Sequence, residues 1–347
     1  GKSVKDIYAY PKNSTGNVNI DKEIESVGTT TIKGKQANAN IGDEITYKVT
    51  YSVPVPENGL TELKIVDTMD KGLTFTNEAS NITVKDDKGV DGTEKTLIYA
   101  TDYEVTLDTT SNEVTIDFEK YLDSLQKNST EESTITYKVK LNESAVLGQA
   151  GNKNKVELVY KNDGETKSKT PDKEVKVFTY GIDLTKQGED GAKLSGVEFK
   201  LTDGTNKIKV LKSGDAYYPS NDAKASSTVT TDEGKIYIRG LKPGTYKLTE
   251  TKTNAGYVLL KDPVVIEIKA NNATGEAEAF VGNKPVTMQN DQKNSGGKTA
   301  EVPLTVVNSK GFDLPVTGGR GIALFTIAGI AIVAAAGSLL FMRKRSK

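Results

Sequence analysis

The sequence predicts an all-β protein made of two tandem β-sandwiches, and three features of the chain support this fold class. Polar and apolar residues alternate over many short runs, such as residues 43–53, 135–141 and 246–250. Successive side chains of a strand point to opposite faces, so each run gives a strand with one buried face. Clusters of Gly, Asn and Asp separate the runs and supply turns. Helical patterns are few, with residues 119–126 the best candidate.

The composition excludes several classes of site. Of the 347 residues, 46 are Lys or Arg and 47 are Asp or Glu, and the net charge of −1 gives no indication of nucleic-acid binding. The chain has no Cys and no His, so disulfides, thiolate or imidazole metal ligands and Ser-His-Asp triads are excluded. We predict no metal and no cofactor. The acidic pair Asp86 and Asp87 is expected in a solvated turn.

A polar segment divides the body of the chain. Residues 167–176 (KSKTPDKEVK) are polar and contain Pro171, which is typical of a linker. The length of the chain allows about two domains plus tails. The sequence therefore predicts a first domain over residues 17–172 and a second over residues 177–311.

The C-terminal residues 314–347 differ from the rest of the chain. Residues 322–342 carry no charge, and the run is long enough to cross a bilayer as a helix. A basic cluster follows at once, which favours a cytoplasmic chain end. A buried core helix would be less uniformly apolar. The pentapeptide just before the span consists of Leu314, Pro315, Val316, Thr317 and Gly318.

This order of LPVTG, apolar span and basic end resembles the LPXTG cell-wall sorting signal of Gram-positive bacteria. The resemblance implies that a sortase cleaves between Thr317 and Gly318 and passes the Thr317 carbonyl to an amine. The apolar helix would hold the protein in the membrane only transiently, before it is anchored to the cell wall. A GPI-anchor signal is the nearest alternative, but its apolar tail does not usually end in basic residues.

Six polar residues share the inward parity of apolar neighbours along the predicted strands. In the runs GIDLTK, YKLTE and LTVVN, for example, a Lys, a Glu and an Asn follow apolar positions in steps of two. Burying a charge is costly unless it is paired or neutralised, so these residues predict a site in each domain. They are Lys22, Asp67 and Asn154 in the first domain and Lys186, Glu250 and Asn308 in the second.

Two interpretations fit this pattern. In the first, each Lys forms a buried ion pair with the carboxylate, and the Asn satisfies the remaining hydrogen bonds. In the second, burial shifts the Lys toward the neutral amine and the carboxyl toward the acid. The amine can then attack the Asn side-chain carbonyl, with Asp67 or Glu250 as the catalytic acid and proton carrier, and ammonia leaves. The expected isopeptide bonds are Lys22–Asn154 and Lys186–Asn308.

The second domain contains a recognisable motif around its acid. Residues 246–257 (YKLTETKTNAGY) resemble the E-box of pilin proteins, roughly YxLxETxAPxGY, with Thr253 and Asn254 where Ala and Pro are usual. With Lys186 near its start and Asn308 near its end, this domain resembles the Cna-B-type isopeptide domain. The resemblance implies an immunoglobulin-like β-sandwich.

The first domain resembles the Cna-A-like isopeptide domain, in which the acid is often Asp. Its segments VDTMDKGLTF and GNKNKVELVY hold Asp67 and Asn154. This assignment leaves one alternative open, because Asn152 has the same parity as Asn154 and no E-box marks the acid.

Residues 10–13 (YPKN) resemble the pilin motif of sortase-built pili. The resemblance implies that Lys12 is the amine that accepts the Thr317 acyl group of the next subunit. The alternative interpretation is an ordinary surface Lys that follows a Pro. Family members carry another domain before this motif, so residues 1–16 are expected to be the end of an N-terminal domain that is missing from this sequence.

Together these resemblances imply a backbone (major) pilin, which is a structural cell-surface protein and not an enzyme. Its expected partners are identical subunits in a covalent head-to-tail polymer, a pilus-specific sortase, ancillary and basal pilins, peptidoglycan through a housekeeping sortase, and host ligands. One alternative is a wall-anchored adhesin or ancillary pilin that binds host matrix. Another is a surface glycosidase with two carboxylates, but Asp67 and Glu250 are expected in different domain cores.

Overall fold

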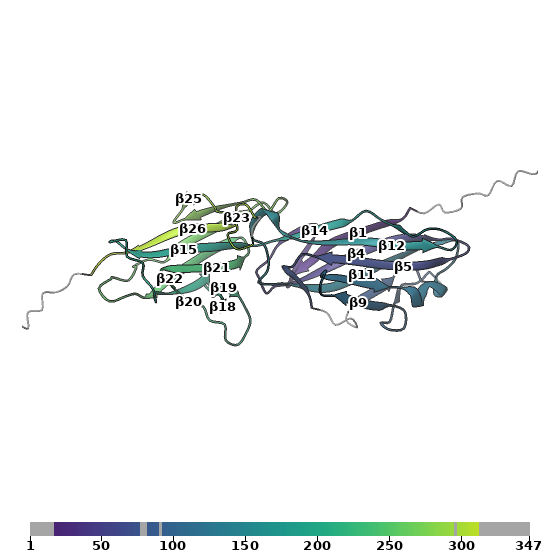
Figure 1. Cartoon of the computed structure of the whole chain (residues 1–347), viewed down its shortest axis with the longest axis horizontal. Coiled ribbons are helices and arrows are strands. Elements are labelled where there is room, and N and C mark those ends of the chain that lie inside the picture. The colour runs from purple at the N-terminus through teal and green to yellow at the C-terminus, as the bar shows by residue number, and fades with distance from the viewer. Residues whose placement is uncertain (1–16, 77–81, 90–91, 295–296, 312–347) are drawn as a thin grey trace, which may run out of the picture.

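The computed structural model describes residues 17–76, 82–89, 92–294 and 297–311. They form two β-sandwiches placed end to end, so the described chain enters at one end of an elongated molecule and leaves at the other (Figure 1). The predicted all-β fold is confirmed. The helix expected at residues 119–126 is the short 3-10 helix η2 (Glu119–Ser124).

The first sandwich packs two sheets face to face. One sheet has the strand order β2-β1-β4-β11-β7-β8, with β6 also paired to β11, and the other has the order β3-β14-β12-β5-β10-β9, with β13 also paired to β12. The strands of the first sheet are β1 (Asn19–Val27), β2 (Thr30–Gly34), β4 (Glu44–Val55), β6 (Leu73–Phe75), β7 (Thr83–Asp86), β8 (Lys95–Thr96) and β11 (Ser129–Leu141). Those of the second are β3 (Gln36–Asn38), β5 (Leu60–Met69), β9 (Glu104–Asp108), β10 (Glu113–Asp117), β12 (Asn152–Asn162), β13 (Ser168–Lys169) and β14 (Lys173–Phe178).

The second sandwich has the same two-layer design. Its sheets have the orders β18-β19-β21-β15-β26 and β17-β16-β22-β23-β24-β25, with β20 also paired to β16. The first and last strands, β15 and β26, lie side by side and run parallel. The strands of the first sheet are β15 (Tyr180–Gly188), β18 (Val210–Ser213), β19 (Ala216–Pro219), β21 (Lys235–Leu241) and β26 (Glu301–Asn308). Those of the second are β16 (Glu198–Asp203), β17 (Asn206–Lys207), β20 (Thr228–Thr230), β22 (Gly244–Lys252), β23 (Val264–Ala270), β24 (Ala277–Val281) and β25 (Lys284–Val286).

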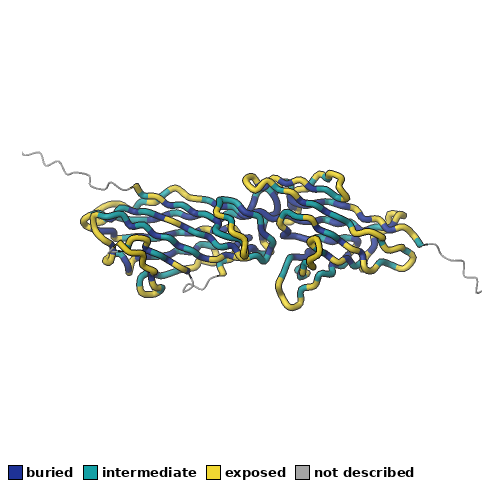
Figure 2. The backbone as a smooth tube through the Cα atoms, turned by 180° about the vertical axis from the view of Figure 1, so that it is seen from behind, coloured by how far each residue is buried: buried dark blue, intermediate teal, exposed yellow. Residues whose placement is uncertain are grey.

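Strand periodicity explains where the two cores lie. In β4, Ile45, Tyr47 and Val49 are buried, whereas Lys48 and Thr50 between and beside them are not. Burying each large apolar side chain stabilises the fold by about 1.5–3 kcal/mol. Figure 2 shows the same division over the whole molecule, with buried residues along the interior of both sandwiches and exposed residues at the loops and outer ends.

The prediction of a linker at residues 167–176 is wrong. Residues 173–178 form β14, which pairs with β12 and β3 and places two valines in the core of the first sandwich. β15 of the second sandwich begins at Tyr180, so only Thr179 separates the two, and Thr179 is itself buried. The first domain therefore extends to residue 178 instead of 172. The outer face of β14 is polar and its inner face carries few apolar residues. The alternation of polar and apolar residues is therefore too weak in the sequence to indicate a strand.

A buried ionic cluster ties the two sandwiches together beside this junction. Arg239 of β21 donates to Asp291 (2.7 Å) and to Glu301, and all three side chains are at most 4% exposed. Asp291 also accepts a hydrogen bond from the backbone amide of Leu147 in the first sandwich (2.8 Å). Gly148, at φ +78°, allows the close approach, because a Cβ there would lie 2.3 Å from a backbone oxygen of the second sandwich. The junction, which includes η3 (Gly148–Ala150), is therefore a packed interface and not a flexible hinge.

The expectation of a solvated turn at Asp86 and Asp87 holds for Asp87 alone. Asp86 is only 2% exposed, and it accepts hydrogen bonds from the Tyr121 hydroxyl (2.8 Å) and the Gly89 amide (2.6 Å). Glu131 is also buried in this region. Burial raises the pKa of Glu131 from its ordinary 4.5 to about 7, and the negative charge of Asp86 adds to the shift.

This shift predicts a pH-dependent stability of the first sandwich. The folded state holds the Glu131 proton more tightly than the unfolded chain, so the free energy of unfolding should fall as the pH rises from about 4.5 to about 7. Replacing Glu131 with Gln should reduce this loss of stability with rising pH, while Glu132→Gln should keep it. Urea unfolding of both variants at about pH 5 and about pH 8 tests the prediction. If Glu131→Gln loses as much free energy of unfolding between the two pH values as the wild type, the prediction is contradicted.

Candidate functional site

The first predicted site lies between the two sheets of the first sandwich. Lys22 comes from β1 in one sheet, while Asp67 and Asn154 come from the adjacent strands β5 and β12 in the other. Asp67 pairs across with Val156, two residues from Asn154, so the carboxyl and the amide project from the same face. All three residues are at most 2% exposed. The structure therefore brings together the three residues that strand parity singled out.

The polar atoms of this site form one connected group. The Lys22 ammonium pairs with Asp67 Oδ2 and also donates to the hydroxyl of Tyr137. The Tyr137 hydroxyl in turn donates to Asp67 Oδ2 and accepts a hydrogen bond from Asn154 Nδ2 (3.4 Å). Within the described part of the chain, Asp67 Oδ1 and Asn154 Oδ1 are buried without a hydrogen-bond partner.

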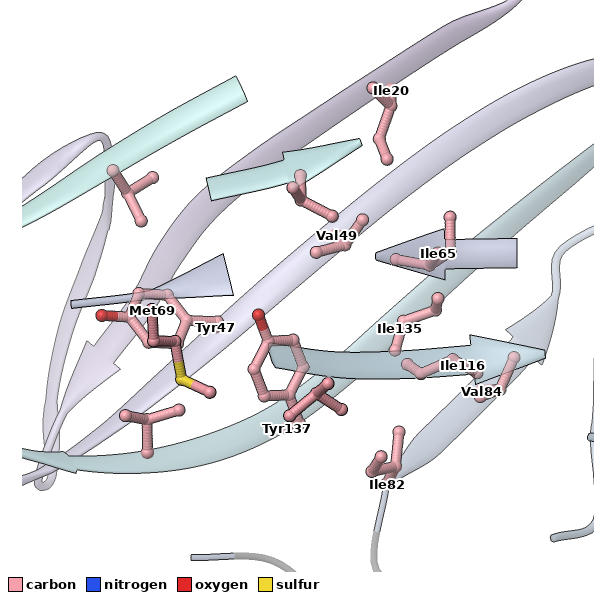
Figure 3. Close-up of a cluster of buried hydrophobic side chains, with 14 of the residues drawn as sticks. Ile20, Tyr47, Val49, Ile65, Met69, Ile82, Val84, Ile116, Ile135 and Tyr137 are labelled. Carbon is pink, nitrogen blue, oxygen red and sulfur yellow. The ribbon is translucent and has the colours of Figure 1, made fainter. Parts of the chain in front are cut away.

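Aromatic rings surround the Lys22 ammonium. Its Nζ lies 4.9 Å from the centre of the Tyr47 ring and 5.1 Å from that of Tyr137. The two rings are 5.8 Å apart, and Figure 3 shows them among Ile, Val and Met side chains of the core. Burial in these surroundings lowers the pKa of Lys22, although the charge of Asp67 opposes the shift. Burial therefore favours the neutral amine form of Lys22 more than an exposed position would.

The structure also separates the two candidate asparagines. Asn152 is fully buried, but its amide donates to the carbonyl oxygens of Val146 (3.0 Å) and Val177 (3.2 Å) and accepts from the Val146 amide (2.9 Å). These contacts hold the loop after β11 against β14. Asn154, not Asn152, lies with Lys22 and Asp67.

The second predicted site lies at the end of the second sandwich away from the junction. Lys186 and Asn308 come from the parallel strands β15 and β26, where Lys186 pairs across with Val306. Asn308 is two residues beyond Val306, so both side chains project from one face of the same sheet. Glu250 reaches them from β22 in the facing sheet. Lys186 and Glu250 have fully buried side chains, and Asn308 is also fully buried.

Glu250 contacts both other members of this site. Its Oε1 lies 3.7 Å from Lys186 Nζ, and its two oxygens accept hydrogen bonds from Asn308 Nδ2 at 2.9 and 3.1 Å. The backbone amide of Leu260 donates to Glu250 Oε2 (2.7 Å) and fixes the carboxyl group. Burial lowers the pKa of Lys186, and the charge of Glu250 opposes this shift.

The two sites differ in what a covalent link would join. A Lys22–Asn154 bond would connect the two sheets of the first sandwich across its core. A Lys186–Asn308 bond would connect neighbouring strands within one sheet, because β15 pairs directly with β26. In both sites an amine, a carboxyl group and a carboxamide meet in a dry core. This chemistry needs no metal, and the described residues contain no cluster of metal-ligating side chains.

Sequence reasoning missed two residues of these sites. Tyr137 has the inward parity of its apolar neighbours in β11, which by itself indicates only a core aromatic. Thr253 follows β22 and accepts a hydrogen bond from Asn308 Nδ2 through Oγ1 (2.8 Å). Thr253 stands where the E-box usually has Ala, and this departure from the motif was the one sequence feature that could have indicated its role. The predicted Lys12, the LPVTG residues 314–318 and the apolar span lie outside the described residues.

Comparison with known proteins matches three parts of the chain to family models. Residues 41–164 match the Gram-positive pilin backbone subunit 2, Cna-B-like domain, and residues 306–347 match the LPXTG cell wall anchor motif. Residues 181–281 match a prealbumin-like fold domain. These matches make the chain similar to Gram-positive backbone pilins. The family model describes the first sandwich as Cna-B-like. This differs from the resemblance to the Cna-A-like type that the sequence motifs suggested. The LPXTG match indicates a cell-wall surface protein.

Curated relatives and solved structures are also similar to this chain. The chain is 23% identical to the trypsin-resistant surface T6 protein of Streptococcus pyogenes serotype M6 over 86% of its own length, and 25% identical to fimbrial subunit type 1 of Actinomyces viscosus over 98%. It spans 55% of the length of the T6 protein and 66% of the length of the fimbrial subunit. The group B streptococcus pilus 2b backbone protein shares its fold, with a TM-score of 0.56 and 24% identity over 85% of this chain and 99% of that one.

Proposed function

We propose that the protein is the structural backbone subunit of a covalent surface pilus. A sortase joins Thr317 of one subunit to Lys12 of the next, which gives a head-to-tail polymer. The match of residues 306–347 to the LPXTG anchor motif supports this function. The apolar span at residues 322–342 retains the precursor in the membrane until the sortase acts. The expected partners are the other subunits, a pilus-specific sortase, ancillary and basal pilins, and peptidoglycan through a housekeeping sortase.

We also propose that each sandwich crosslinks itself through an isopeptide bond. The observation that carries this proposal is that each core buries a Lys, a carboxyl group and an Asn in one connected polar group, joined through the Tyr137 hydroxyl in the first sandwich and through Glu250 in the second. The Lys passes a proton to the carboxylate and becomes a nucleophile. It attacks the Asn side-chain carbon, and ammonia leaves. In the second sandwich, a half-turn of the Asn308 amide would bring its unpaired Oδ1 to the protonated Glu250 carboxyl, which then stabilises the negative charge on that oxygen.

The polymer predicts a specific effect of Lys12. Replacing Lys12 with Ala should abolish the high-mass ladder of covalent polymers in cell-wall extracts, because the acceptor amine is removed. Lys5→Ala, in the same N-terminal segment, is the matched control and should leave the ladder unchanged. Immunoblots of wall extracts measure the result. A ladder that survives Lys12→Ala would refute the backbone role of Lys12 and favour the alternative, a wall-anchored adhesin or ancillary pilin that binds host matrix.

A further inference from the structure

The two crosslinking sites use different contacts between the acid and the amide. In the second sandwich, both oxygens of Glu250 accept hydrogen bonds from Asn308 Nδ2. In the first sandwich, the hydrogen bonds of Asp67 within the described residues run to Lys22 and Tyr137, and Asn154 Nδ2 donates to Tyr137. The Tyr137 hydroxyl therefore stands between the acid and the nitrogen that must leave as ammonia.

The side-chain lengths explain this difference. Asp67 is one methylene shorter than Glu250, so its carboxyl stays closer to its own sheet. Tyr137 reaches across from β11 in the facing sheet and places its hydroxyl in contact with Asp67 Oδ2, Lys22 Nζ and Asn154 Nδ2. A tyrosine on the opposite sheet thus makes the contacts that a longer acid makes directly in the second sandwich.

We propose that Tyr137 is a catalytic residue of the first-sandwich crosslink and relays a proton from Asp67 to the departing nitrogen of Asn154. This inference rests on the proposed isopeptide chemistry and adds a residue to it. Tyr137 touches the attacking and the leaving nitrogen, which a residue that only supports the fold need not do. Burial and the charge of Asp67 raise the pKa of Tyr137, so its hydroxyl stays protonated and available as a donor.

The protons balance in this scheme. Lys22 first gives one proton to Asp67, and its neutral Nζ then attacks Cγ of Asn154. The Cγ–Nδ2 bond breaks as Tyr137 gives its proton to Nδ2 and takes the Asp67 proton in exchange. The remaining surplus proton on Nζ passes to the Asp67 carboxylate. One amide bond has formed, one has broken, ammonia leaves and Asp67 ends protonated.

The test compares the rates of the two crosslinks in the same molecule. The full chain is made in a cell-free reaction with detergent, samples are quenched at intervals, and peptide mapping gives the fraction of Lys22–Asn154 and Lys186–Asn308 bonds. Replacing Tyr137 with Phe should slow the first bond about 100-fold, which is within the usual contribution of a proton-transfer group. The second bond should keep its rate and serves as the internal clock.

Two further variants separate proton relay from packing. Tyr121→Phe also removes a buried hydroxyl that donates to a carboxylate, Asp86 (2.8 Å), in the same sandwich, and it should leave both rates unchanged. In the Tyr137→Phe background, Asp67→Glu supplies a longer acid and should restore the first bond. Circular dichroism confirms that each variant is folded.

The outcomes discriminate between the two proposals. A first bond that forms at the wild-type rate in Tyr137→Phe overturns the relay, and so does a folded Tyr137→Phe, Asp67→Glu variant that stays slow. If the wild-type chain forms neither bond, the isopeptide proposal itself fails. If it forms both, the result for Tyr137→Phe decides the relay alone.

Discussion

Replacing Glu250 with Ala is expected to leave the second sandwich without its crosslink. Glu250 touches both Lys186 and Asn308, so the variant lacks the group that accepts the Lys proton. The bond would close a loop of 122 residues (308 minus 186), and its loss should reduce the stability by roughly 5 kcal/mol by analogy with disulfide loops. Lys186 would also lose its buried partner, which typically costs a further 3–5 kcal/mol, about the scale of a whole domain's stability.

Two measurements follow this variant. The intact mass should show the loss of one ammonia instead of two, and chemical unfolding should show a weakened second sandwich. Glu198→Ala is the matched control, because Glu198 lies on the neighbouring strand β16 and pairs with the exposed Lys252 (3.1 Å). It should keep both crosslinks. Undiminished formation of the Lys186–Asn308 bond in Glu250→Ala would contradict the role of Glu250 as the acid.

Replacing Asn154 with Ala is expected to remove the crosslink of the first sandwich alone. The Lys22–Asp67 pair remains, so the main loss is the closure of a loop of 132 residues (154 minus 22), again roughly 5 kcal/mol. Peptide mapping would then find the Lys186–Asn308 bond only, and the urea midpoint of the first sandwich should fall.

Asn152→Ala provides the contrast to Asn154→Ala. Asn152 makes structural hydrogen bonds to Val146 and Val177, so its loss should cost about 1–3 kcal/mol and leave the crosslink in place. A crosslink that survives Asn154→Ala and disappears in Asn152→Ala would reverse the assignment of the two residues.

The two proposed bonds would also determine how the protein carries tension. In the second sandwich, force that enters at β15 can pass from Lys186 directly to Asn308 in β26, so residues 187–307 lie outside the loaded path. In the first sandwich, force that enters at β1 can pass from Lys22 to Asn154 and leave through β12 and β14. Covalent bonds would then carry load that hydrogen-bonded strand pairs carry in an uncrosslinked sandwich.

Strand parity predicts much of these sites from the sequence. A strand alternates its faces every residue, so a polar residue in step with apolar ones must face the core wherever that strand forms. Parity alone places Lys22, Lys186 and Asn308 inside the sandwiches, and all three are fully or almost fully buried. It does not show which candidates meet, because that depends on how the two sheets pack.

The features that the sequence did not reveal depend on contacts between distant strands. Tyr137 looks like any core aromatic until β11 is placed opposite β5 and β12. Arg239 contacts Asp291 and Glu301, which follow it by 52 and 62 positions in the sequence, and Asp291 in turn contacts a loop of the other sandwich. The residues of β14 resemble a linker because the solvent-facing ones are charged, and pairing with β12 and β3 is what makes them a strand.

The most direct test of the two internal crosslinks is the intact mass of the folded full chain, followed by tandem mass mapping. Two isopeptide bonds predict a mass lower than that of the sequence by two molecules of ammonia, with joined peptides at Lys22–Asn154 and Lys186–Asn308. A folded chain with the full mass of its sequence would contradict both bonds.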